Sequence, residues 1–219
     1  MIVKSFGCSF IFGTDLPDAG RGEPKARASF LTWPALIAQN KKAGYRCYAR
    51  PGAGNLQILE RLMSQIACNE YALYIIGWSW IDRFDYTNQD NNQWCTIMPI
   101  DTDLTAKTYY KELHSQYRDK LTSLMCIKLA IDTLQQRGYP FIMTFMDDLI
   151  FEKPWHTTPA LTDMQDYIRP HLTQFDNTNF LNWSKQKGFE ISQTLHPLES
   201  AHQAAADYML NTCGVLQSL

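Results

Sequence analysis

Short apolar runs alternate along the chain with longer segments in which apolar residues recur at helical spacing. The apolar runs have the length of strands and lie at residues 2–6, 45–49, 72–76, 141–145 and 189–191. The helical segments lie between and after them, at residues 33–42, 58–66, 109–137, 163–168, 183–188 and 199–213. Strands that alternate with helices predict a parallel sheet covered by helices on both faces. We therefore expect an α/β fold, a flavodoxin-like three-layer α/β/α sandwich with about five strands.

Two segments interrupt this alternation. Residues 15–29 are rich in glycine, proline and charge, which predicts an exposed loop. Residues 87–108 are dominated by Asn, Gln and Asp, which favours a long and mostly irregular insertion able to act as a lid. With 219 residues, the chain is most simply one domain, 1–219, that carries this insertion.

Composition narrows the classes of function. The hydrophobic content of 45% and charged content of 19% are typical of a globular protein. A net charge of −2 provides no basic field, so nucleic acid is not an expected partner. No apolar run approaches the roughly 20 residues that span a bilayer, and no signal-peptide pattern is visible, so we expect a cytoplasmic or particle-associated protein without a membrane partner. The oligomeric state stays open.

The six cysteines are scattered and form no C-x-x-C pair. They are Cys8, Cys47, Cys68, Cys95, Cys126 and Cys213. A zinc site needs ligands at close spacing, so the sequence predicts free thiols, no metal and no cofactor.

The first candidate for chemistry follows the first strand. Gly7-Cys8-Ser9 ends that strand with small residues. In open α/β sheets, ligands bind at the carboxyl ends of the strands, so Ser9 is our candidate nucleophile. Taken alone, a serine at this position more often caps a helix or a turn.

The last predicted helix offers partners for this serine. Glu199 and His202 are three residues apart, which places them on neighbouring positions of one helix face. A carboxylate beside a histidine fixes its tautomer and stabilises the imidazolium, and such a histidine can act as a general base. Each residue also has a structural interpretation, since acids are favoured in the first turn of a helix and histidines are found in cores.

Four segments in this order resemble the conserved blocks of the SGNH (GDSL-like) hydrolases. They are Gly7-Cys8-Ser9-Phe10, Pro51-Gly52-Ala53-Gly54-Asn55, Ile76-Gly77-Trp78-Ser79 and Glu199-Ser200-Ala201-His202. Cys8 stands where that family often has Asp. The resemblance implies a serine esterase in which Ser9 attacks an ester carbonyl, His202 takes the proton and Glu199 orients His202. Its expected substrate is a small acyl ester, with acetyl release from a carbohydrate as one form.

The resemblance also implies an oxyanion hole. Its donors would be the N–H of Ser9, the N–H of either Gly52 or Gly54, and the residue at position 79. The family places Asn there and this chain has Ser79, whose hydroxyl donates a single hydrogen bond with less reach than an amide. Asn55 compensates if its side chain turns inward, although capping of the next helix is its more common role.

Other polar and aromatic residues follow the same predicted strands. Trp78 and Arg83 are candidates for substrate contact. Asp82, Asp85, Asp147 and Asp148 are weaker candidates, because exposed ion pairs and solvated loop acids are common. His196 resembles a position just outside the pocket, where His196-Pro197 would shape a turn.

Three alternatives stay open at this point. One is a catalytically weak or inactive SGNH-like binding or structural module of a larger assembly, which the absence of Asn at position 79 favours. Another is cysteine chemistry at Cys8, which requires Cys8 rather than Ser9 to face the crevice. The weakest is a nucleotide-binding loop at residues 7–13, because no Gly-Lys-Ser/Thr follows it.

Overall fold

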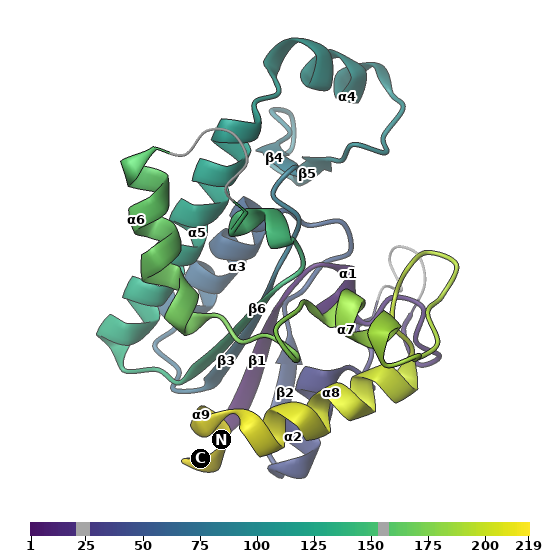
Figure 1. Cartoon of the computed structure of the whole chain (residues 1–219), viewed down its shortest axis with the longest axis vertical. Coiled ribbons are helices and arrows are strands. Elements are labelled where there is room, and N and C mark those ends of the chain that lie inside the picture. The colour runs from purple at the N-terminus through teal and green to yellow at the C-terminus, as the bar shows by residue number, and fades with distance from the viewer. Residues whose placement is uncertain (21–26, 153–157) are drawn as a thin grey trace.

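The computed structural model describes residues 1–20, 27–152 and 158–219. Its centre is a parallel sheet of four strands in the order β2-β1-β3-β6. The strands are β1 (Ile2–Gly7), β2 (Gly44–Cys47), β3 (Leu73–Trp78) and β6 (Phe141–Phe145). Helices cover both faces of this sheet (Figure 1). The predicted three-layer α/β/α architecture is confirmed.

Each face of the sheet has its own core, built from alternate residues of the strands. Phe6, Tyr74 and Ile76 pack on one face with α3 (Asn55–Ala67), α5 (Gln116–Arg137) and α6 (Pro159–Ile168). Val3 and Ile75 pack on the other face with α2 (Trp33–Asn40), α7 (Phe180–Gln186) and α8 (Glu199–Thr212). This period of two is the alternation of side chains along a strand, here with both faces buried. Shorter helical elements outside the insertion are α1 (Ser9–Phe12), α9 (Gly214–Gln217) and the 3₁₀ turns Asp148–Ile150 and Arg169–His171.

The sheet has four strands rather than the expected five or so. Beyond β6, Leu172 forms a single parallel bridge with Met143, so the next position of the sheet is occupied for one residue only. The expected strand at 189–191 is likewise one bridge, between Ile191 and Pro197. Two hydrogen bonds flank this bridge: the N–H of Ser192 donates to the His196 carbonyl, and the N–H of Leu198 donates to the Glu190 carbonyl.

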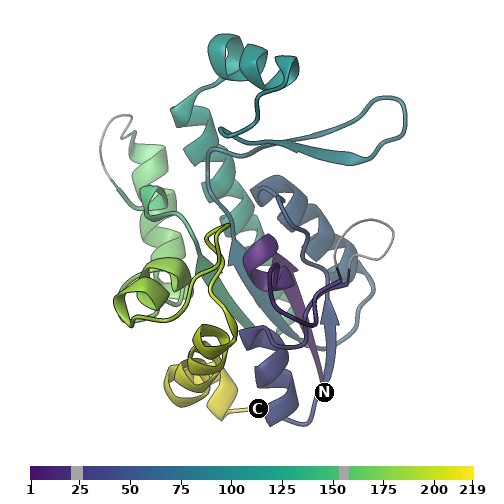
Figure 2. The same ribbon diagram turned by 90° about the vertical axis from the view of Figure 1, so that its right-hand side faces the viewer.

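The insertion is more regular than its composition predicted. In the structure the insertion extends over residues 84–113: an antiparallel hairpin, β4 (Phe84–Thr87) and β5 (Trp94–Ile97), is followed by α4 (Leu104–Thr108) and a π-helical turn (Tyr109–Leu113). Ile97, Ala106 and Tyr109 form a small core of its own. The insertion projects from the end of the sheet (Figure 2). Within residues 87–108, β5 and α4 are regular and the segments between them are turns and loops, so the expected irregular segment holds in part. The Asp103 cap, which accepts from the N–H of Ala106 at 3.0 Å, begins α4.

Part of the loop expected at 15–29 lies outside the described residues, namely 21–26. On either side of this gap, Gly20 and Arg27 form an antiparallel bridge. All six cysteines are free. In the described part of the chain, no helix combines the length and apolar composition needed to cross a bilayer.

Candidate active site

Three of the four sequence blocks meet at the carboxyl edge of the sheet. The parallel register pairs Gly7 with Gly77, so Ser9 and Ser79 each follow a paired glycine by two residues. The N–H of Arg50 donates to the carbonyl of Gly7 at 3.0 Å, which holds the glycine loop beside the same strand end. A Cβ at either Gly7 or Gly77 would lie 2.6 Å from a side-chain atom of Ile11, so the two glycines allow α1 to pack tightly over this edge.

Ser9 is the first residue of α1 and retains 7% exposure. Its neighbour Cys8 is fully buried in the core of the α2–α8 face. Because Cys8 faces the core, cysteine chemistry at this position has no structural support.

The predicted pair of Glu199 and His202 is not formed. His202 is 1% exposed, and its Nδ1 accepts the backbone N–H of Trp33 at 3.1 Å. A ring nitrogen that accepts a hydrogen bond carries no proton, so Nδ1 of His202 cannot donate a hydrogen bond to a carboxylate. Glu199 is exposed, and no hydrogen bond joins it to His202 among the described residues. Burial lowers the pKa of His202 to about 3, with a smaller contribution from the charge of His196. These facts describe a neutral core histidine that fixes α8 to α2.

A different histidine is held by a carboxylate. Nδ1 of His196 lies 2.9 Å from Oδ2 of Asp15, a residue 181 positions earlier in the chain. The His196 side chain is 12% exposed and that of Asp15 22%. No hydrogen-bond partner of Nε2 occurs within the described residues. This arrangement fixes the tautomer that a general base requires.

The Asp15 carboxylate is surrounded by hydroxyl donors. The hydroxyls of Thr194 and Ser192 both donate to Oδ2, the latter at 2.8 Å. The Thr194 bond is the largest of the effects that hold the pKa of Asp15 at about 2, while burial opposes them. Asp15 is therefore charged across the neutral range and can stabilise an imidazolium at His196.

Aromatic contacts place His196 beside the start of α1. The ring of Phe10, the residue after Ser9, lies 5.0 Å from the His196 ring and 5.4 Å from that of Trp80. Leu195, next to His196, has φ of 66°, which bulky residues rarely adopt. Strain of this kind clusters at functional sites.

The two candidate oxyanion glycines differ in their surroundings. The N–H of Gly54 donates to Oδ1 of Asp85 at 3.0 Å, and the N–H of Gln57 donates to Oδ2 at 2.9 Å. Asp85 is thus a buried cap of α3 rather than a substrate contact, and burial raises its pKa against these hydrogen bonds. Gly52 has φ of 81° with open space around its Cα. Asp85 therefore engages the N–H of Gly54 but not the N–H of Gly52.

The Asn55 side chain is fully committed. Its Oδ1 accepts the N–H of Ser79 at 2.7 Å, and its Nδ2 donates to the Ser79 carbonyl and to the Ser123 hydroxyl. The amide therefore has no proton left for an oxyanion. The hydroxyl of Ser79, by contrast, is buried and has no hydrogen-bond partner among the described residues.

The other candidates make contacts within the fold. Trp78 is fully buried, with Nε1 near the sulfur of Met143, so it cannot touch a substrate. Arg83 donates to the Ala53 carbonyl at 3.0 Å and stacks on Trp80 at 4.7 Å, which fixes it to the glycine loop. Asp147 accepts the N–H groups of Ile81 and Leu149, both at 3.0 Å, and Asp148 accepts from the amides of Asn179 and Asn182.

Sequence reasoning missed Asp15 as a site residue. It sits in the loop after α1, and residue 193, three before His196, is Gln rather than an acid. No acid-x-x-His pattern therefore points to His196. One signal did favour His202 as a core residue: it lies among Ala201, Ala205 and Ala206, on the small apolar face of its helix.

Comparison with known proteins supports the fold. No family model and no curated protein matches the chain. Among solved structures, the psychrotrophic esterase EstA from Pseudoalteromonas sp. is 11% identical, covers 100% of this chain and 99% of its own, and has a TM-score of 0.55. A lipolytic protein of the G-D-S-L family from Veillonella parvula is 11% identical, with 97% and 98% coverage and a TM-score of 0.54. A carbohydrate esterase family 2 enzyme from Corynascus thermopiles (Myceliophthora fergusii) is 12% identical, with 100% and 67% coverage and a TM-score of 0.55. The chain has the fold of the SGNH/GDSL hydrolases, as its sequence blocks predicted.

Proposed function

We propose that this protein is a serine-dependent ester hydrolase in which Ser9 is the nucleophile, His196 the general base and Asp15 the carboxylate that orients it. The observation that carries the proposal is the 2.9 Å contact between Nδ1 of His196 and Asp15, with the ring packed on the residue that follows Ser9. The esterases among the structural neighbours share the fold and support this choice of chemistry.

Each group has a defined task in this mechanism. Oγ of Ser9 attacks the ester carbonyl carbon while its proton passes to Nε2 of His196. The imidazolium keeps its Nδ1 proton directed at the charged Asp15, then gives the Nε2 proton to the departing alcohol. Water repeats the sequence on the acyl-serine and releases the acid.

The oxyanion that forms in each step needs hydrogen-bond donors. We assign this role to the N–H of Ser9, the Ser79 hydroxyl and the N–H of Gly52. Support comes from the unpaired Ser79 hydroxyl and from the engagement of the Gly54 N–H by Asp85. A serine hydroxyl replaces the amide of the family pattern, and loss of one such donor costs about 10²–10³ in rate. We therefore expect a slow enzyme.

The substrate in this proposal is a small acyl ester, with an acetylated carbohydrate as one form. A carbohydrate esterase among the neighbours supports the carbohydrate part. The same features of the oxyanion donors favour a second candidate, a catalytically weak binding module. Gly54 and Asn55, the two residues best suited to donate, are both occupied by the protein itself.

Hydrolysis of p-nitrophenyl acetate tests the proposal. We would compare the parent protein with Ser9→Ala, His196→Gln and, as a matched histidine control, His202→Asn. Ser9→Ala and His196→Gln should lower kcat by about 10³-fold or more, to background, with unchanged thermal melts. His202→Asn should retain kcat within a few-fold and lose stability. A parent protein inactive on acetyl and butyryl esters would favour the binding module instead.

A further inference from the structure

A cavity of about 210 Å³ lies between the loop after β3 and the insertion. Its polar wall comes from the β3 loop, the π-helical turn and the start of α5, and consists of Asp82, Tyr110, His114, Gln116 and Asp119. Drug-sized ligands occupy pockets of roughly 300–1,000 Å³, so this cavity suits a smaller group. Ile81 and Asp82, which line it, directly follow Trp80, the residue packed on Phe10.

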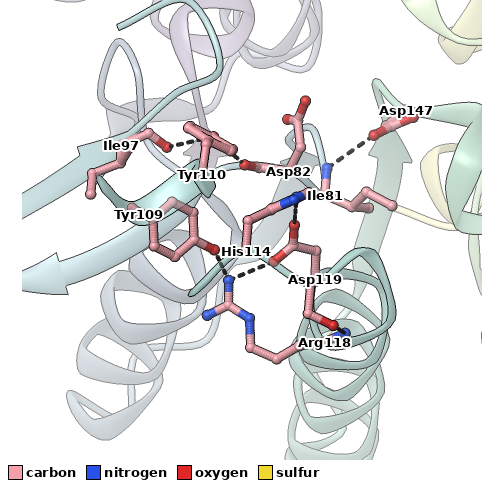
Figure 3. Close-up of polar contacts among 10 residues, drawn as sticks. Ile81, Asp82, Ile97, Tyr109, Tyr110, His114, Arg118, Asp119 and Asp147 are labelled. Carbon is pink, nitrogen blue, oxygen red and sulfur yellow. Dashed lines mark hydrogen bonds and ion pairs between the residues drawn. The ribbon is translucent and has the colours of Figure 1, made fainter. Parts of the chain in front are cut away.

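Asp119 lies between an arginine and a histidine, one at each carboxylate oxygen. The carboxylate is 3% exposed, and Oδ1 lies 2.6 Å from Nη2 of Arg118, whose guanidinium also contacts the Tyr109 hydroxyl. Oδ2 lies 2.9 Å from Nε2 of His114 but accepts no aligned hydrogen bond within the described residues. Figure 3 shows His114 and Arg118 on either side of this carboxylate. A buried oxygen with unused acceptor capacity therefore stands on the cavity wall.

Asp82 has no cationic partner among the described residues. Its neighbour Arg83 donates instead to the Ala53 carbonyl and stacks on Trp80. Burial raises the pKa of the half-buried Asp82, the charge of Asp147 adds to the rise, and Arg83 opposes it. A carboxylate without a counter-ion, partly removed from water, gains from any cation that enters the cavity.

Tyr110 presents an aromatic surface beside these acids. Its hydroxyl donates to the backbone carbonyl of Asp82 at 2.8 Å, and its ring lies 5.1 Å from that of His114 (Figure 3). These contacts fix the ring in the cavity wall. A fixed aromatic face next to carboxylates is the environment that attracts organic cations.

We propose that this cavity binds the primary ammonium group of a small organic ligand, with Asp82 as its counter-ion, Asp119 as a further acceptor and Tyr110 as an aromatic wall. A neutral polyol leaves the Asp82 charge uncompensated. Within the described residues, no group of three His, Cys, Asp or Glu side chains is placed to hold a metal ion, which favours an organic cation. The site requires none of the serine chemistry and stands without it.

Calorimetric titration with D-glucosamine and D-glucose tests the charge, since the two sugars share a ring and differ at one substituent. The titrations use the Ser9→Ala protein near neutral pH and at moderate salt, so that the Asp82 carboxylate, whose pKa is raised, keeps its charge alongside the amine, and ester hydrolysis plays no part. Variants are Asp82→Asn, Tyr110→Leu and the control Asp90→Asn, which removes an equal charge from the exposed hairpin turn.

We expect glucosamine to bind and glucose to bind at least tenfold more weakly. Asp82→Asn should weaken glucosamine binding by about tenfold or more, as for loss of a charged hydrogen bond, and Asp90→Asn should not change it. Tyr110→Leu should also weaken glucosamine binding, although this variant keeps the Asp82 carboxylate. Equal affinity for the two sugars, or unchanged glucosamine binding in a folded Asp82→Asn protein, would overturn the proposal.

Discussion

Acidification should destabilise this protein through His202. In the folded state, burial holds the pKa of His202 at about 3, whereas an unfolded histidine titrates near its ordinary value of 6.5. As pH falls below about 6.5, the unfolded chain takes up a proton at this residue and the folded one does not. The stability that His202 contributes is therefore present above that pH and is lost on acidification.

The size of the effect follows from linkage. Each pH unit between the two pKa values shifts the unfolding free energy by about 1.4 kcal/mol. From about pH 7 to about pH 5, roughly one and a half units lie below the unfolded pKa, which corresponds to a loss of about 2 kcal/mol. The carboxyls of Asp82, Asp85 and Asp147 have raised pKa values and act in the opposite direction. The pH dependence of the parent protein's stability therefore combines these effects and does not report the His202 contribution alone.

Urea unfolding of the parent and of His202→Asn at the two pH values isolates it. Asparagine keeps an acceptor for the Trp33 N–H and does not titrate, so the variant is less stable at neutral pH because of the space left beside Phe180. The difference in unfolding free energy between the two proteins should shrink by about 2 kcal/mol on acidification. A difference that stays constant would show that His202 is protonated or exposed in the folded state, and would refute its assignment to the core.

Four further substitutions have defined outcomes. Asp15→Asn should lower kcat by about 10²-fold or more in a p-nitrophenyl acetate assay while KM stays within a few-fold, because His196 then loses its charged partner; an unchanged kcat would contradict this role. Asp85→Ala should lower the free energy of unfolding in urea by about 2–4 kcal/mol, because the carboxylate accepts hydrogen bonds from two buried N–H groups and from the hydroxyl of Thr96. Thr96→Val removes only one of these hydrogen bonds and should lower it by about 1 kcal/mol. Trp78→Phe should lower the free energy of unfolding by about 1–3 kcal/mol and leave KM for p-nitrophenyl acetate unchanged. A raised KM would indicate that Trp78 contacts the substrate.

The fold was readable from the sequence because its signals are local. β3, in the middle of the sheet, reads as continuously apolar because it is buried on both faces, and β6 is mostly apolar, whereas β1 and β2 carry Lys4 and Arg46 among their apolar residues. Gly138 ends α5 in the left-handed conformation that glycine favours. Ser115 begins the same helix later than periodicity alone suggested, through a side-chain bond to the N–H of Arg118.

The site was less readable because its partners are distant in sequence. Ser9 and Ser79 could be placed at one edge from strand order alone, since both follow parallel strands. The contact between Asp15 and His196 joins two loops 181 residues apart, and no periodicity encodes it. Glu199 and His202 had the expected spacing, yet the direction of the His202 ring depends on where α8 packs against α2. Spacing within a helix does not determine that direction.

Covalent labelling shows directly whether Ser9 is the nucleophile and His196 its base. A p-nitrophenyl ethylphosphonate reagent reacts when Ser9 Oγ forms a bond to phosphorus, p-nitrophenolate leaves and the serine proton passes to His196. Peptide mass spectrometry should find one adduct, on Ser9, in the parent and in His202→Asn, and none at the same exposure time in His196→Gln. Labelling that survives in His196→Gln but is lost in a folded His202→Asn protein would show that His202, not His196, is the base.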